Sequence, residues 1–247
     1  LQNIFSINQI TIAYRNFEGF ELAKNIVKQF RYQIKRIEIL SDNIEKEKEI
    51  LINSKSNIVV FDTLSVRKEL LLCLKEKNKF LISFDELGQG INIFDVIIYS
   101  LIKPKVKDKK SVYVGYEYLN LSTEIIKKSY IKKKPKIFVV SLGGNDKRKL
   151  LIKILEILKE LPKNLKFIFI VSNNDYNNLA NEVLKRKLRF DNLEILVNPK
   201  NFYSLASKAD IAIVGGGLTL FEFAAMGIPT ISIPQHKHQV ENIKALI

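Results

Sequence analysis

The sequence predicts an α/β protein with parallel β-sheets in two domains, on the basis of three observations. Short β-branched runs alternate with longer segments of helical periodicity along the 247-residue chain, the pattern of parallel strands joined by crossover helices. The runs are nearly continuously apolar, which predicts strands that are covered on both faces. A lysine-rich stretch ending at Pro135 interrupts the alternation, and we place the domain junction there.

The first domain is expected at residues 1–130. Its predicted strands read ITIAY, RIEIL, NIVVFD, FLISFD and DVIIY, with SVYVGYEY as a further candidate. A Rossmann-like domain opens with a strand, a glycine turn and a helix, whereas the opening LQNIFS resembles the tail of a helix. We therefore expect this domain to be incomplete, without its first strand, and the chain to be a fragment.

The second domain is expected at residues 135–247. It begins with KIFVVSLGG, continues through LKFIFIVS, LEILVN and IAIVGGG, and reaches TISIP. Helical segments separate these runs, at about 147–161, 175–188 and in shorter stretches later. Strands and helices in this order predict a complete doubly wound, Rossmann-like unit.

The formal charge of +14 raises the question of an anionic partner, either nucleic acid, lipid or a phosphorylated small molecule. The lysines are scattered through helices, and only 126–136 (IKKSYIKKKPK) is dense. Without a recognition motif or aromatic-basic interleaving, we expect no nucleic acid partner. A weak contact with an anionic membrane surface is the better expectation. No apolar run is long enough to span a bilayer, and the lone Cys73 can form no intramolecular disulfide, so we expect a cytoplasmic protein.

Two glycine-rich turns follow predicted strands of the second domain, SLGGND at 141–146 and IVGGGLTLFE at 213–222. The carboxyl edge of a parallel sheet is where ligands bind and where helix N-termini present free N–H groups. A phosphate group is the ligand that such N–H groups most readily bind. Neither turn matches the dinucleotide fingerprint or the P-loop. The alternative is that these glycines only make tight strand-to-helix turns.

Glu222 allows two interpretations. With Thr219 it has the T-x-x-E spacing of a capping box, in which both side chains satisfy first-turn N–H groups. Its carboxylate, which only accepts hydrogen bonds, would equally suit the two hydroxyls of a ribose.

The segment after the last predicted strand, QHKHQVEN, is polar. His236 and His238 have no nearby third ligand and fit no standard zinc spacing, so we expect neither a metal nor another cofactor. Gln239 and Asn242 can donate and accept hydrogen bonds toward a sugar, or simply be solvated. In the first half, Asp62 and Asp85 end neighbouring strands, where they would form a catalytic pair or cap the following turns.

Taken together, these motifs resemble a known family. The stretch FVVSLGGND…NFYSLASKADIAIVGGGLTLFEFAAMGIPTISIPQHKHQVENI resembles the C-terminal donor-binding domain of GT-B nucleotide-sugar enzymes, the glycosyltransferase 28 type. More narrowly, it is similar to the UDP-sugar hydrolases of pseudaminic acid biosynthesis and their spore-coat polysaccharide relatives. The upstream VVFDTL, SFDELG, DVIIYS and GYEYLNLS follow in that family's order. The resemblance implies a GT-B-like fold.

The resemblance also implies a set of substrate-binding residues for a UDP-sugar. Gly143 and Gly144 would flank the crevice, with Asn145 and Asp146 opening the next helix. Glu222 would bind the uridine ribose, and Gln239 the sugar or a nearby phosphate. Asn242 is a further candidate. The diphosphate would be bound by Gly215, Gly216, Gly217, Leu218 and Thr219.

The chain also departs from the family. The family opens with G-x-G-H, whose histidine is the expected catalytic base, and no equivalent histidine is present, so the catalytic residue is unknown. Ser122 stands where the family has an arginine, and Leu64 where it has a tyrosine. For the complete protein the resemblance implies UDP-sugar hydrolysis in surface-polysaccharide or nonulosonic acid biosynthesis. Inverting transfer from a UDP-sugar and non-catalytic UDP-sugar binding are the alternatives.

Overall fold

The computed structural model divides the chain into two compact units, Leu1–Tyr118 and Leu119–Ile247. Each unit is described by itself. The structure describes residues 11–16, 35–40, 44–101, 111–127, 130–144, 146, 148–186 and 190–246. None of the helices in these ranges is long and apolar enough to cross a membrane.

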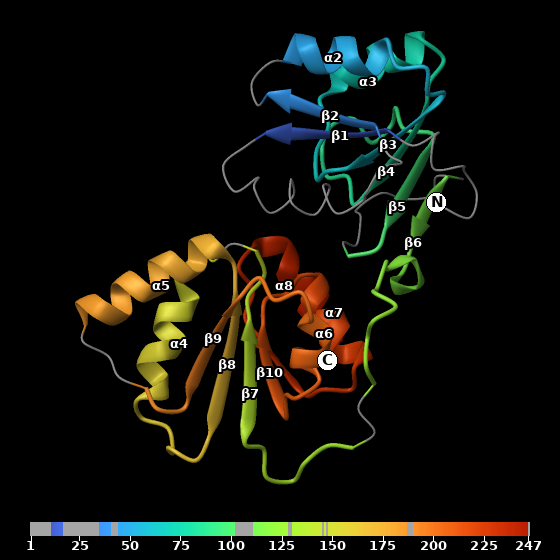
Figure 1. Ribbon diagram of the computed structural model, residues 1–247. Coiled ribbons are helices and arrows are strands. Elements are labelled where there is room, and N and C mark those ends of the chain that lie inside the picture. The colour runs from blue at the N-terminus through green and yellow to red at the C-terminus, as the bar shows by residue number, and fades with distance from the viewer. Residues whose placement is uncertain are drawn as a thin grey trace. The chain divides into compact units, whose positions relative to one another are not determined.

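The first unit contains two parallel sheets (Figure 1). One pairs β1 with β2, and the other has the order β3-β4-β5-β6. The strands are β1 (Thr11–Asn16), β2 (Lys35–Leu40), β3 (Ile58–Asp62), β4 (Phe80–Phe84), β5 (Val96–Tyr99) and β6 (Val112–Val114). The helices are α2 (Ile44–Ile52), α3 (Lys68–Glu76) and the short 3-10 helix η2 (Tyr116–Tyr118). The candidate strand SVYVGYEY is thus a strand only in its first part.

The expectation that these strands are covered on both faces is wrong for β3. Val59 and Phe61 are buried and pack in one cluster with residues of α3, whereas Ile58 and Val60 are 42% and 43% exposed. The same is true of β4, where Leu81 is buried and Phe80 is 44% exposed. An unbroken apolar run does not reveal whether helices cover one face of a strand or both. In this sheet buried and exposed side chains alternate along the strands, as they do when only one face is covered.

The second unit is a doubly wound parallel sheet with the order β11-β10-β7-β8-β9. Its strands are β7 (Ile137–Ser141), β8 (Lys166–Val171), β9 (Leu193–Val197), β10 (Ile211–Val214) and β11 (Thr230–Ser232). Its helices are α4 (Leu150–Leu158), α5 (Asn173–Lys185), α6 (Phe202–Ala206), α7 (Leu218–Ala225) and α8 (Lys237–Lys244). This confirms the parallel α/β fold predicted from the alternating pattern.

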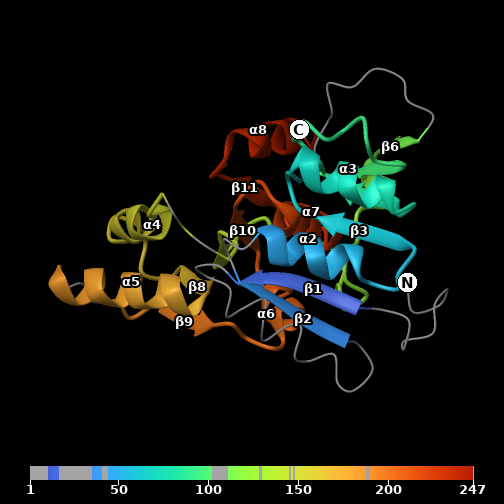
Figure 2. The ribbon, with the colours of Figure 1, turned by 90° about the horizontal axis from the view of Figure 1, so that it is seen from above.

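Helices cover both faces of this sheet, with α4 and α5 on one side and α6 and α7 on the other (Figures 1 and 2). On the first side, leucines and isoleucines of α4 pack with Phe167, Phe169 and Leu179 in one buried cluster. On the second, Phe202 meets the buried Phe223 edge to face, with ring centroids 6.2 Å apart. Burial on both faces explains why Phe167–Val171 read as a continuous apolar run.

Helix α5 begins with a side-chain cap, which gives a test of this region's packing. The Ser172 hydroxyl accepts a hydrogen bond from the Asp175 amide at 3.2 Å, and Ser172 is buried. Ser172→Ala should lower the free energy of unfolding by about 1 kcal/mol, because the first turn loses its acceptor. Urea denaturation measures this, with the exposed Asn173→Ala as control. An equal loss in both variants would contradict the assignment of the cap.

Candidate functional site

The strand order of the second sheet reverses between β7 and β10, so that successive strands are added first on one side of β7 and then on the other. Strands β8 and β9 lie on one side of β7, and β10 and β11 on the other. Such a reversal opens a crevice at the carboxyl ends of the two central strands. Because Ser141 and Val214 are register partners, the two glycine-rich turns leave the sheet side by side. The structure therefore brings both predicted turns to one place.

The second turn is held by polar side chains of α8. Gln239 Oε1 accepts hydrogen bonds from the amides of Gly216, at 3.2 Å, and Gln235, at 2.8 Å. Asn242 Nδ2 donates to the Gly216 carbonyl oxygen at 2.9 Å, and Asn242 is only 2% exposed. Of the two alternatives for Gln239 and Asn242, simple solvation is wrong, since both side chains brace the turn. Gln239 also borders the crevice, because its Nε2 is 3.7 Å from where a Cβ on Gly217 would lie.

Strand β11 and the loop after it hold the beginning of the same turn. The Ser232 hydroxyl donates to the Gly215 carbonyl oxygen at 3.0 Å. The Gln235 side chain, which is buried, donates to the carbonyl oxygen of Leu142 at the start of the first turn. A Cβ on Gly215 would lie 3.2 Å from that same Leu142 oxygen. Glycine at 215 therefore permits the close approach of the two turns.

Helices α4 and α7 both begin at this edge, and neither N-cap residue makes a side-chain hydrogen bond, but a carboxylate further back in the chain reaches the first amides of α4. The Asp146 carboxylate accepts hydrogen bonds from the amides of Leu150, at 2.9 Å, and Leu151, at 2.7 Å, and so occupies the first amides of α4, whose N-cap residue is Lys149. Helix α7 has Gly217 as N-cap, with no side-chain hydrogen bond. The amides of its first residues, Leu218 and Thr219, have no partner within the helix by its geometry. The start of α7 is therefore the end that is open to an anion.

Glu222 lies in the second turn of α7 and is 9% exposed. Its Oε1 accepts a hydrogen bond from the Tyr203 hydroxyl of α6 at 2.5 Å. The capping-box interpretation is wrong: the N-cap is Gly217, so Thr219 already lies inside the helix and cannot act as the cap. The carboxylate is instead fixed from the side through Oε1, and its Oε2 accepts no hydrogen bond from the residues that the structure describes.

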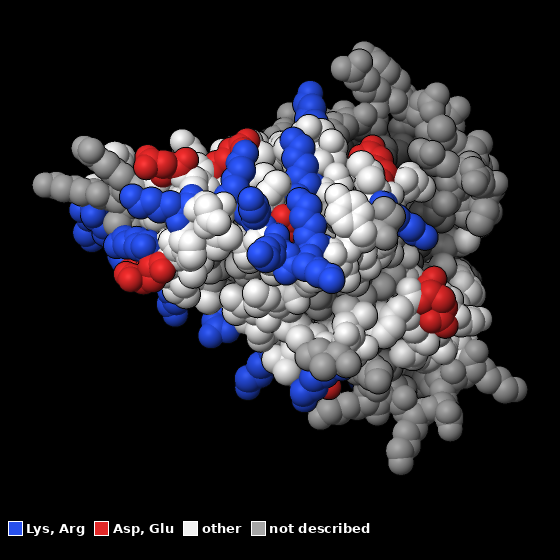
Figure 3. Space-filling view, turned by 90° about the horizontal axis from the view of Figure 1, so that it is seen from below, with Lys and Arg blue, Asp and Glu red and all other residues white. Residues whose placement is uncertain are grey.

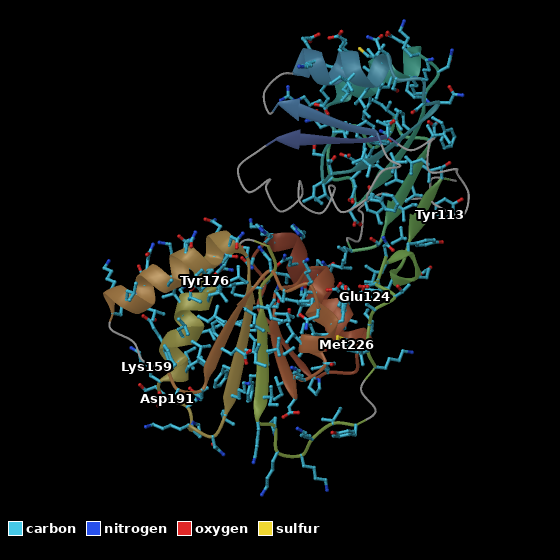
Figure 4. The ribbon with its side chains drawn as sticks, viewed as in Figure 1. Tyr113, Glu124, Lys159, Tyr176, Asp191 and Met226 are labelled. Atoms are coloured by element: carbon cyan, nitrogen blue, oxygen red, sulfur yellow. The ribbon has the colours of Figure 1, made fainter. Side chains whose placement is uncertain are left out.

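Tyr203 is itself held by a second hydroxyl. Ser122 hydrogen-bonds to the Tyr203 phenol, and the Ser122 Oγ accepts from the Glu124 amide at 3.1 Å. Glu124 comes from the segment before β7 and is labelled in Figure 4 beside α6 and α7. Ser122, Tyr203 and Glu222 thus form a chain of hydrogen bonds that ends at the candidate ligand carboxylate.

The Tyr203 pKa provides a pH test of this chain. Burial, followed by the hydrogen bond to Glu222, raises the Tyr203 pKa from 10.0 to about 12. A raised folded-state pKa contributes stability that is fully present below pH 10 and is lost as the pH rises from 10 to 12. We expect the stability advantage of the wild type over Tyr203→Phe to be constant at pH 8–9 and to shrink above pH 10. Thermal melts of both proteins across this range measure it, and an unchanging difference would contradict it.

The first glycine turn is the more open one. Gly143 has φ +96°, which favours glycine, and a Cβ there would meet no atom within 4 Å. Gly144 is exposed. Asn145 lies outside the described residues.

The remaining candidates do not join this site. The rings of His236 and His238 stack 5.5 Å apart, and the described part of the chain contains no group of three potential metal ligands. In the first unit, the Asp85 carboxylate accepts from the amides of Ser100, at 2.9 Å, and Leu101, at 3.1 Å. Asp85 therefore caps the turn after β5, while Asp62 is exposed, and the structure favours capping over a catalytic pair.

Sequence reasoning missed two residues at this edge. Arg148 Nη1 donates to the Pro234 carbonyl oxygen at 2.8 Å, which places a permanent positive charge between the loops after β7 and β11. Tyr203 was not predicted either, because it precedes Glu222 by 19 positions on another helix. For Arg148, its place shortly after the first glycine turn was a signal that could have identified it. For Tyr203 the sequence offered no such signal.

The fold and this edge together define the class: an α/β protein with parallel sheets, GT-B-like, whose candidate site lies at the switch point of its second unit. The glycosyltransferase family 28 C-terminal domain matches residues 137–247. In solved structures the fold is similar to a UDP-N-acetylglucosamine 2-epimerase from Rickettsia bellii (TM-score 0.61, 19% identity, 94% of this chain and 73% of that one). It is also similar to MurG of Acinetobacter baumannii (TM-score 0.56, 15% identity, 90% and 71%).

Three curated relatives extend the match over most of the chain. An uncharacterized protein of Methanocaldococcus jannaschii is 25% identical over 96% of this chain and 51% of its own length. The spore coat polysaccharide biosynthesis protein SpsG of Bacillus subtilis is 28% identical over 78% of this chain and 60% of its own length. A Thermoanaerobacter protein is named UDP-N-acetylglucosamine--N-acetylmuramyl-(pentapeptide) pyrophosphoryl-undecaprenol N-acetylglucosamine transferase. It is 24% identical over 93% of this chain and 70% of its own length. The chain thus spans between half and two thirds of the first two relatives.

Proposed function

We propose that this chain binds a UDP-sugar at the carboxyl edge of its second sheet. The observation that carries this proposal is the position of Glu222, a nearly buried carboxylate fixed by Tyr203 just beyond the uncapped start of α7. In this assignment the amides at Gly217–Thr219 receive the diphosphate and Glu222 accepts from the ribose hydroxyls. The names of two relatives, a spore-coat polysaccharide protein and a UDP-N-acetylglucosamine transferase, support the ligand class.

The two turns divide the contacts between them. Gly215 and Gly216 set the backbone of the phosphate turn, and Gln239 reaches its rim with Nε2. Gly143 and Gly144 leave open space on the opposite side of the crevice. Asn242 acts through Gly216 rather than on the ligand, because it is buried behind the turn.

For the complete protein, we put inverting glycosyl transfer first. An acceptor hydroxyl would attack the anomeric carbon, the bond to the diphosphate oxygen would break, a base would take the proton, and UDP would leave. The start of α7 would stabilise the charge that develops on the leaving diphosphate. The glycosyltransferase match and the Thermoanaerobacter relative favour this reaction.

Hydrolysis is the second candidate, with water in place of the acceptor hydroxyl. It is supported by the resemblance of the sequence motifs to UDP-sugar hydrolases and their spore-coat polysaccharide relatives, and a spore coat polysaccharide biosynthesis protein has the highest identity of the three relatives described above. It uses the same donor pocket and the same leaving group, so only the nucleophile distinguishes the two reactions.

Calorimetric titration of this chain with UDP tests the binding site, with ADP as the control for base recognition. We expect UDP to bind and ADP to bind at least about tenfold more weakly. A folded chain that binds neither would contradict the proposal.

The reaction is tested on the complete protein by following UDP release from UDP-N-acetylglucosamine as a probe. Release with water alone indicates hydrolysis. Release that requires an added acceptor indicates transfer. Binding without release under either condition would support the non-catalytic alternative.

A further inference from the structure

We propose that the amino-terminal edge of the second sheet is a docking surface for the anionic headgroups of a lipid membrane. The inference rests on the charge and exposure of this edge and does not depend on the proposed function. Seven lysines at the amino ends of β7, β8 and β10 are exposed, six in the preceding loops and one at the first residue of β8, and we call them the basic edge: Lys132, Lys133, Lys134, Lys136, Lys163, Lys166 and Lys208.

Backbone contacts show that these loops meet. The Lys166 amide donates to the Lys136 carbonyl oxygen at 2.7 Å. The Lys136 amide donates to the buried Asp210 carboxylate at 2.9 Å, and Lys132 Nζ lies 3.0 Å from Asp210 Oδ1. Figure 3, which views the molecule from the side where β7 begins, shows Lys and Arg side chains gathered in the middle of that face.

Most of the positive charge on the basic edge is uncompensated. Lys132 pairs with Asp210, and Lys166 pairs with Glu194 at 2.9 Å. The other members form no ion pair with any residue that the structure describes: Lys133, Lys134, Lys136, Lys163 and Lys208. Lysines close to an anionic bilayer each add to its attraction, and five unpaired ones make a strong local field.

Two exposed apolar side chains adjoin these lysines. Tyr130 and Ile131 directly precede Lys132 and are 61% and 68% exposed. A tyrosine suits the headgroup level of a bilayer, and an isoleucine beside it gains by entering the acyl boundary. Lysine also contacts the bases and phosphates of nucleic acid, but an exposed tyrosine and isoleucine beside the lysines gain more from the headgroup level and acyl boundary of a bilayer. The combination therefore favours a membrane over a nucleic acid.

Docking at this edge would leave the candidate site free. The glycine turns and the start of α7 are at the carboxyl ends of the strands, and the basic edge is at their amino ends. A strand of five residues such as β7 separates the two edges by roughly 15 Å. Lipid binding and nucleotide binding should therefore be independent of each other.

Co-sedimentation of the chain with lipid vesicles tests the proposal. The probes are phosphatidylcholine vesicles with and without about 30 mol% of the anionic lipid phosphatidylglycerol. We expect binding only to the anionic vesicles, and its loss in 0.5 M NaCl, where screening extends over only about 4 Å. Lys133→Glu/Lys134→Glu should lower the partition coefficient at least about tenfold, and Ile131→Ser about threefold. UDP affinity should stay within about twofold in all of these variants.

The matched control is Lys153→Glu/Lys237→Glu, which makes the same change in net charge at two exposed positions near the starts of α4 and α8. We expect it to lower the partition coefficient less than about threefold. Should Lys133→Glu/Lys134→Glu fail to give a cooperative thermal melt, Lys163→Glu/Lys208→Glu serves instead. An equal loss in control and test variants, or no binding to anionic vesicles, would overturn the proposal.

Discussion

Glu222→Ala should weaken UDP binding by more than about tenfold, or 1.4 kcal/mol. The wild-type carboxylate is held by the Tyr203 hydroxyl at 2.5 Å and is nearly buried, so little conformational freedom is lost when a ribose binds. Alanine removes the acceptor for the ribose hydroxyls and leaves the Tyr203 hydroxyl without its partner. Calorimetric titration with UDP measures the loss.

Two variants separate this effect from a general disturbance of α7. Glu222→Gln keeps a hydrogen-bond acceptor for Tyr203 but removes the charge, so its loss should be smaller than that of alanine. Glu160→Ala, at an exposed position after α4, should bind UDP as the wild type does. If Glu222→Ala binds UDP with wild-type affinity, Glu222 is only a partner for Tyr203 and the ribose assignment fails.

The fold of the second unit was predictable from its sequence because its signals are local. Each of its strands is a short apolar run, and its helices have the expected periodicity, so the order of elements fixes the parallel sheet. The helix expected at 147–161 is Leu150–Leu158, and that expected at 175–188 is Asn173–Lys185. The starts of both helices differ from the expectation because side-chain hydrogen bonds to first-turn amides help to set them, from Asp146 at α4 and from the N-cap Ser172 at α5.

The internal bonding of the site was not predictable because it depends on contacts between distant residues. Tyr203 and Glu222 are 19 positions apart, and Asn242 and Gly216 are 26 apart. Spacing in the sequence suggested a Thr219–Glu222 capping box, but the true N-cap depends on where the glycine turn ends. The same limit explains the error in the first unit, where an apolar run did not distinguish a half-covered strand from a fully covered one.

Gly216→Ala should be the most damaging small substitution in the glycine turn. A Cβ at 216 would lie 2.6 Å from Gln239 Cβ and 2.8 Å from the Gln239 carbonyl oxygen. Since one of these atoms is backbone, α8 must shift, and the bonds from Gly216 to Gln239 and Asn242 would be strained with it. We expect a loss of about 2–3 kcal/mol in the free energy of unfolding. Urea denaturation measures it.

Gly217→Ala, one residue later, distinguishes packing from binding at the same turn. Here a Cβ would make only an ordinary contact, 3.7 Å from Gln239 Nε2, and φ is −94°, so we expect stability within about 1 kcal/mol of the wild type. The methyl group would nevertheless occupy space beside the open amides of α7, where the diphosphate is proposed to bind. UDP affinity should therefore fall at least about fivefold, or 1 kcal/mol, while stability is kept. A Gly217→Ala protein that is stable and binds UDP normally would place the diphosphate elsewhere, and a Gly216→Ala protein as stable as the wild type would show that α8 does not hold the turn.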